Sequence, residues 1–437
     1  VWPEIRTGMS ATTTGIYFQP RQFRSGEPRV RARRPDELYP ERFYWNLAAD
    51  AGLRVAAVDQ PLTPAYPNGS AVELAEWGTH DRVGFEAGPE DGTARRIIGH
   101  HGRSPVWECD RINDGTARGK DRLLTDIEEG LDKKTSLLTE LVASSDWDLF
   151  TAVFSEAHCG GHHFWPPGGD VDGIIKDIYA PLDRAVGDVV AAAGPDATVI
   201  VYSSHGMSPI DRGQALVADV LERMGYVHGN PQRRRLAAAV PGWLRGPIRR
   251  LVGTAALQRA GLTYDRPLGD PETLAVPLPN SRHGAIRLSL AGRDPGGVLE
   301  PGSDAYHRVF AQITDAFRGL RTVEGDHRAV QNVVVIDDAL GIDRHPDLPD
   351  LIVRFRRDLG VFTACRSPDL GTIEITPRDH RTGEHGTPGA IWATGPAIPA
   401  ETSLQDARTI DIAPTVLALL GLPVPGWVDG APTTGIG

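Results

Sequence analysis

Short apolar runs recur along the chain, and segments with helical periodicity separate them. The predicted strands are Leu53 to Val58, Leu149 to Ser155, Thr198 to Ser203, Val333 to Ile336, Leu351 to Phe355 and Ala390 to Thr394. The predicted helices are Pro40 to Ala51, Asp121 to Ser144, Val171 to Ala192, Gln214 to Met224, Asp304 to Arg318 and Asp411 to Leu420. This alternation is typical of an α/β fold whose mostly parallel central sheet is flanked by helices on both faces. Ligand sites in such folds gather at the carboxyl ends of the strands.

The spacing of these elements predicts one α/β domain over residues 1–437, with a cap-like insertion at about residues 211–345. The insertion contains a basic stretch with apolar residues between its arginines: Arg233, Arg234, Arg235, Arg245, Arg249 and Arg250. We interpret this stretch as a solvated cap helix. Contact with a membrane surface or an anionic substrate tail is the alternative.

Composition and charge disfavour several classes of binding partner and structural module. The net charge of -11 disfavours a general surface for nucleic-acid polymers but allows a local metal-bearing pocket. Three widely spaced cysteines predict neither a disulfide framework nor a cysteine-rich zinc module. The sequence shows no transmembrane segment and no secretion signal, so the expected location is the cytoplasm. The oligomeric state is not predicted.

Histidines follow the predicted strand that begins at Leu149. His158, His162 and His163 lie within six residues, beside Glu156. If this stretch is helical, the spacing of four places His158 and His162 on one face, where two imidazoles can converge on a zinc-like ion. Glu156 is then a candidate second-shell partner. The alternative is that these histidines pack or form structural hydrogen bonds.

Two further segments place a histidine beside a strand. The strand ending at Ser203 continues into Ser204-His205-Gly206, whose glycine allows a sharp turn beside a ligand. Gly383-Glu384-His385-Gly386 precedes the strand Ala390 to Thr394, with Glu384 as a weaker candidate. The alternatives are a plain strand-to-loop transition and unrelated surface loops.

These three segments, in this order, resemble the alkaline phosphatase superfamily, and most closely its type I phosphodiesterase and nucleotide pyrophosphatase branch. The family patterns are Glu-x-Asp-x-x-x-His, Ser-Asp-His-Gly and Gly-x-His. Further segments are similar to other family elements and extend the resemblance over nearly the whole chain: Trp2 to Gly8, Thr14 to Tyr17, Asn280, Gly284 to Gly296, Pro349 to Leu351 and Asp411 to Pro423.

The resemblance implies a two-metal site. His158, His162 and His385 are expected to hold one ion, and Ser204 and His205 occupy the positions of the Asp-His pair that holds the other. The family's remaining aspartate and its Thr or Ser nucleophile fall upstream of Val1, so no catalytic nucleophile is assigned within the chain. Two neighbouring ions stabilise the attacking and leaving oxygens of an in-line displacement.

Two residues depart from the family pattern. His158 replaces an aspartate, so the first site has only neutral nitrogen ligands, which favours zinc over magnesium. Ser204 also replaces an aspartate and supplies no charge to balance a second cation.

The predicted function is metal-dependent hydrolysis of phosphate diesters or of related phosphate, sulfate or phosphonate esters, with a small-molecule ester as substrate and one or two divalent ions, zinc by expectation, as cofactor. The alternative is a non-catalytic or one-metal member of the same fold that acts as a binding protein.

Overall fold

The computed structural model describes most of the chain: residues 1–17, 21–22, 26–27, 31–32, 42–61, 63, 71–79, 93–106, 109–166, 173–227, 272–278, 280, 282–341, 344–376, 379–399, 404 and 406–433. The basic stretch at residues 233–250 lies outside these ranges. The chain divides into two compact units. The first contains Val1–Ile16, Arg33–Ile210 and Pro377–Gly437, and the second contains Tyr17–Ala32 and Asp211–Thr376. The single domain with an insertion at about 211–345 stays a prediction.

A parallel sheet in the first unit has helices on both faces. Strand β3 (Val55–Val58) lies between β4 (Ala71–Leu74) and β5 (Leu149–Ala152) and is parallel to both. Its alternate side chains belong to different apolar clusters, because successive residues of a strand face opposite sides of the sheet. Val55 packs with Trp45 of α4 (Tyr44–Asp50) and Leu417 of α16 (Ile412–Leu419). Val58 packs with Leu137 of α7 (Ala117–Ala143).

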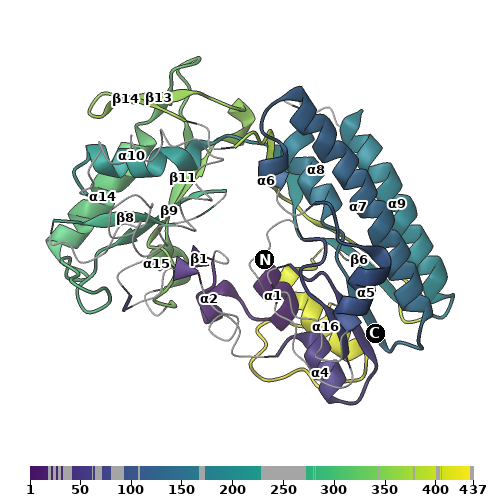
Figure 1. The fold of residues 1–437 in the computed structure, drawn as a ribbon. Helices are drawn as coiled ribbons and strands as arrows, with labels where there is room; N and C mark the ends of the chain where they lie inside the picture. Colours follow the sequence, from purple (N-terminus) through teal and green to yellow (C-terminus); the bar gives the residue numbers. More distant parts are fainter. Residues whose placement is uncertain are drawn as a thin grey trace. The chain divides into compact units, whose positions relative to one another are not determined.

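The predicted α/β class with a parallel sheet is therefore confirmed. Helix α7 contacts α9 (Ile174–Ala193), and the two lie side by side (Figure 1). The Thr116 side chain accepts a 3.0 Å hydrogen bond from the amide of Gly119 at the start of α7, which satisfies a donor that the helix itself leaves unpaired. Shorter elements of this unit are α1 (Trp2–Thr7), α2 (Ala11–Thr14), α5 (Thr93–His101), α6 (Cys109–Ile112) and η3 (Thr409–Asp411).

Two antiparallel strand pairs follow one another along the same two stretches of chain. Strand β6 (Val199–Ser203) pairs with β16 (Ala390–Thr394), and β7 (Gly206–Pro209) pairs with β15 (Gly383–Gly386). Residues 199–209 thus run antiparallel to residues 383–394. The second and third histidine-bearing segments of the sequence are neighbours for this reason.

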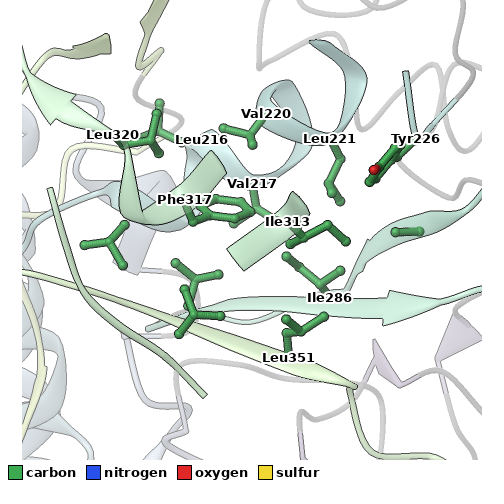
Figure 2. Close-up of a cluster of buried hydrophobic side chains, with 14 of the residues drawn as sticks. Leu216, Val217, Val220, Leu221, Tyr226, Ile286, Ile313, Phe317, Leu320 and Leu351 are labelled. Carbon is green, nitrogen blue, oxygen red and sulfur yellow. The ribbon is translucent and has the colours of Figure 1, made fainter. Parts of the chain in front are cut away.

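The second unit is built on an antiparallel sheet with the strand order β11 (Val330–Val335), β12 (Leu351–Phe355), β9 (Gly284–Leu288) and β8 (Ala275–Leu278). Figure 2 shows apolar residues of α10 (Leu216–Arg223) and α14 (Asp304–Arg318) packed with Ile286 of β9 and Leu351 of β12. Its smaller elements are β1 (Arg21–Gln22), β2 (Arg31–Ala32), η1 (Gly213–Ala215), β10 (Arg321–Thr322), α15 (Ile336–Leu340), η2 (Arg357–Leu359), β13 (Ala364–Ser367) and β14 (Gly371–Glu374).

Two arginines of the family-like segment after Asn280 pair with buried carboxylates in the second unit. Arg287 Nε donates to Asp294 Oδ1 over 2.9 Å, and Arg293 forms a two-point contact with Asp350 at 2.7 and 2.8 Å. Both carboxylates are fully buried. Burial of such ions requires close pairing, so these arginines hold strand ends together.

The sequence located most elements to within a few residues. The helix predicted at Asp304 to Arg318 matches α14, whose N-terminal amides are capped by Ser303. The strand predicted at Val333 to Ile336 begins earlier, at Val330, and ends at Val335, because Ile336 already belongs to α15. Within the described ranges, no helix combines the length and apolarity needed to cross a membrane.

His283 gives the second unit a predicted pH dependence. Burial and the charges of Arg282, Arg354 and Arg357 lower the pKa of His283 to about 4. The unfolded chain therefore binds a proton near pH 6.5 that the folded chain binds only near pH 4, so stability falls as the pH falls through this interval. We expect His283→Gln to lose less unfolding free energy than the wild type between pH 7 and pH 4.5 in urea titrations. His307→Gln, at an exposed position of α14, serves as the control. Equal losses in His283→Gln and wild type would contradict this prediction.

Candidate metal centre

Helix α8 (Glu156–Phe164) carries the first pair of candidate ligands. It starts four residues after β5 ends, at the carboxyl edge of the parallel sheet. His158 and His162 are one helical turn apart, and their ring centroids are separated by 4.4 Å. The helix that the spacing required is therefore present, and both imidazoles lie on one face of it.

Strand β15 carries the third candidate. His385 is paired with Met207 in the β15–β7 ladder, and the ring of His205, just before β7, stacks on the ring of His385 at 3.9 Å between centroids. The His205 centroid is also 5.8 Å from that of His158. The fold thus brings together all four histidines expected to bind metal.

The ligand nitrogens of His158, His162 and His385 lie within 4.8 Å of one another. His162 Nδ1 is 2.9 Å from the carbonyl oxygen of Gly383, which can only accept, so Nδ1 carries the proton and Nε2 keeps its lone pair. That Nε2 atom is 3.1 Å from His385 Nε2. A carbonyl that fixes the tautomer of a histidine is the usual partner of a metal ligand.

A glycine at the start of β15 allows this approach between α8 and β15. A Cβ atom on Gly383 would lie 2.1 Å from the carbonyl oxygen of Gly161, which is far inside van der Waals contact. The amide of Thr382 donates to the carbonyl of His162 over 2.8 Å and fixes the position of the strand against the helix. Packing therefore requires a glycine at position 383.

The remaining sequence candidates have different surroundings. Glu384 is buried, and its Oε1 accepts a hydrogen bond from the backbone amide of His385 at 2.9 Å and lies 3.7 Å from His385 Nδ1. Ser204 is half-buried and directly precedes His205. The Glu156 carboxylate lies 3.1 Å from the ammonium of Lys134, and its suggested role as a partner of a metal ligand stays a prediction. As the first residue of α8, it points away from the helical face that carries the histidines.

Lys134 anchors the start of α8, and the sequence analysis missed it. Its fully buried ammonium lies 3.0 Å from Asp59 and 3.1 Å from Glu156, and it donates to the carbonyl of Val153 over 3.0 Å. Burial opposes the charged form, but the two carboxylates raise the pKa of Lys134. A signal did exist: Lys134 occupies a position of α7 where Ile127, Leu131 and Leu138 predict an apolar side chain.

His163 and its neighbours form a second group that sequence reasoning did not resolve. His163 is one residue beyond His162, so it leaves the helix in another direction and contacts Asn113 at 3.0 Å and Asp110 at 3.3 Å. Burial opposes protonation, but hydrogen bonds with Asp110 and Cys109 raise the pKa of His163 to about 9. Of the three clustered histidines, this one fits the structural alternative.

Arg381 joins this group to the metal candidates. Its Nε and Nη2 donate to the two oxygens of Asp110 at 2.7 and 2.6 Å, and its Nη1 is 3.5 Å from His162 Nε2. Burial acts against ionisation of Asp110, but the hydrogen bonds from His163 and Arg381 hold its pKa well below the usual range. No motif in the sequence connected residues 110 and 381.

The chain matches the model of the type I phosphodiesterase / nucleotide pyrophosphatase family over residues 2–389. It therefore belongs to this family, within the alkaline phosphatase superfamily, and is a hydrolytic enzyme that acts on phosphate esters. No curated protein matches it in sequence.

Solved structures support the same fold. Phosphonoacetate hydrolase from Sinorhizobium meliloti 1021, in complex with phosphonoformate, is 14% identical with a TM-score of 0.51, over 96% of this chain and 83% of that one. Murine ectonucleotide pyrophosphatase / phosphodiesterase 5 is 13% identical with a TM-score of 0.50, over 97% of this chain and 83% of that one. At these identities the likeness establishes the fold alone.

The buried lysine leads to a stability prediction. Replacing Lys134 with methionine leaves Asp59 and Glu156 buried without their cation, and we expect the unfolding free energy to fall by about 3–5 kcal/mol. Lys133→Met is the matched control, since Lys133 is partly exposed and pairs with Glu129 on the same helix, where the expected loss is about 0.5 kcal/mol or less. Urea unfolding of both variants measures the difference. A loss in Lys134→Met as small as that expected for Lys133→Met would show that the contacts of Lys134 with Asp59 and Glu156 contribute little to stability.

Proposed function

We propose that the chain is a zinc-dependent hydrolase of phosphate diesters, with His158, His162 and His385 as ligands of one ion and His205 as a ligand of a second. The observation that carries this proposal is the convergence of three imidazole nitrogens within 4.8 Å at the carboxyl edge of a parallel sheet. A neutral set of nitrogen donors suits zinc better than magnesium.

The donor set fits such an ion chemically. His162 presents an unprotonated Nε2 because its Nδ1 faces the carbonyl of Gly383, and His205 Nδ1 faces the carbonyl of Gly206 at 3.0 Å in the same way. Both histidines can thus bind through Nε2. A zinc ion held there would polarise a phosphoryl oxygen and stabilise the charge that develops on displacement. The protein's part is to fix these nitrogens and to hold the ester beside them.

Phosphate diesters are the preferred substrate class because the matched family is that of type I phosphodiesterases. The similarity to a phosphonoacetate hydrolase keeps phosphonates as the next class to test. Monoesters differ from diesters by one additional negative charge. Bis(4-nitrophenyl) phosphate, 4-nitrophenyl phosphate and a phosphonate ester therefore separate these possibilities.

The direct test is loss of one ligand. We expect His162→Ala to lose one zinc per chain by elemental analysis after dialysis, and to lose more than about 100-fold in kcat/KM for bis(4-nitrophenyl) phosphate, since outer partners of metal ligands alone contribute 10- to 100-fold. His307→Ala, an exposed histidine of the second unit, should keep both properties. Unchanged zinc content in His162→Ala would contradict the proposed site.

Ser204 favours a second candidate, a one-metal member of the family. A hydroxyl beside His205 brings no charge to balance a second cation, whereas a carboxylate there would. We expect Ser204→Asp to tighten binding of the second zinc equivalent at least about tenfold, measured by titration calorimetry, while the first equivalent changes little. Ser208→Asp, on the adjoining strand β7, is the control for added charge. No change at the second equivalent would mean that His205 is not part of an ion site.

A further inference from the structure

We propose that Arg381 binds a phosphoryl oxygen of the substrate, jointly with the ion held by His158, His162 and His385. This inference rests on the proposed function and adds to it a cationic residue that selects and orients the anionic group. Arg381 lies two residues before Gly383, the first residue of β15, so the strand that supplies His385 also positions the guanidinium.

The first support is the orientation of the guanidinium. Two of its nitrogens, Nε and Nη2, are held by Asp110 in a two-point contact at 2.7 and 2.6 Å, so the plane of the group is fixed. The third, Nη1, is 3.5 Å from His162 Nε2, the nitrogen whose lone pair faces His385. The edge of the guanidinium opposite Asp110 is therefore directed at the point where the imidazoles converge.

The second support is electrostatic. An arginine stays charged in proteins, so a zinc ion at the histidines would have a fixed cation as its neighbour. Like charges this close repel, although Asp110, at the Nε and Nη2 edge, and the nearby Glu384 compensate part of the guanidinium charge. An anion that bridges the ion and Nη1 removes the repulsion. A phosphoryl group is suited to this position, because its separate oxygens can accept from both cations at once.

The third support is the rigidity of the surroundings. The amide of Thr382, the next residue, donates to the carbonyl of His162 over 2.8 Å, and its carbonyl accepts from the amide of Ile210 over 3.1 Å. Asp110 is itself held by His163 on α8. Backbone and side chain are thus tied to the elements that carry the candidate ligands, which keeps the distance from Arg381 to the ion site constant.

The test compares Arg381→Met, Arg381→Lys and Arg408→Met by calorimetric titration with inorganic phosphate, each as zinc-loaded full-length protein. Arg381→Met should keep the zinc stoichiometry and bind phosphate roughly 10- to 100-fold more weakly, as expected for loss of a hydrogen bond between charged groups. Arg381→Lys keeps a charge without the two-point contact, so its affinity should lie between those of wild type and Arg381→Met. Arg408→Met removes an exposed charge of the same unit and should stay within about twofold of wild type.

Zinc affinity without phosphate is the second readout. Removal of a repelling cation should leave zinc binding in Arg381→Met equal to or tighter than in wild type. Weaker zinc binding in this variant would assign Arg381 a structural role and overturn the proposal, as would a phosphate affinity within about twofold of wild type.

The outcomes also separate this inference from the proposed function. If the wild type binds no zinc at the histidines, the proposed function fails. Phosphate binding by the zinc-free proteins then tests the role of Arg381 by itself. Weaker phosphate binding by zinc-free Arg381→Met than by wild type would still support its role. Absence of phosphate binding by the zinc-free wild type would overturn the proposed role of Arg381.

Discussion

The contact between α8 and β15 is the constraint on which the candidate site depends. A Cβ atom on Gly383 would lie 2.1 Å from the carbonyl oxygen of Gly161, and its absence permits His162 Nε2 and His385 Nε2 to approach to 3.1 Å. The same contact provides the Gly383 carbonyl that fixes the tautomer of His162. Two stretches more than 200 residues apart in sequence thus become one site through the absence of a side chain at Gly383.

The strands next to α8 and β15 position the remaining histidines. Strand β5 leads into α8, and the ladder formed by residues 199–209 and 383–394 brings His205 to His385. Lys134 pairs with two buried carboxylates at the point where α8 begins. The strand ladder therefore fixes the elements that carry His205 and His385, and the Lys134 contacts fix the start of the helix that carries His158 and His162. Such fixed elements allow the four side chains to converge before an ion binds.

The sequence predicted this part of the molecule well because its signals are local. Short apolar runs located the strands, the spacing of His158 and His162 predicted a shared helical face, and the order of three histidine segments pointed to the superfamily. A carboxylate two residues from a histidine suggested a partner for that histidine, but the sequence could not show that the helix turns Glu156 toward Lys134. The contacts of Asp110 with Arg381 and of Asp59 with Lys134 could not be predicted, since they join distant segments through single side chains that carry no periodic pattern.

The central claim is that three imidazoles from α8 and β15 form one metal site. X-ray absorption spectroscopy at the zinc edge of the zinc-loaded protein tests it most directly. The account predicts a first shell with nitrogen at about 2.0–2.1 Å and outer-shell scattering from about three imidazole rings. A first shell of oxygen or sulfur without imidazole scattering would contradict it.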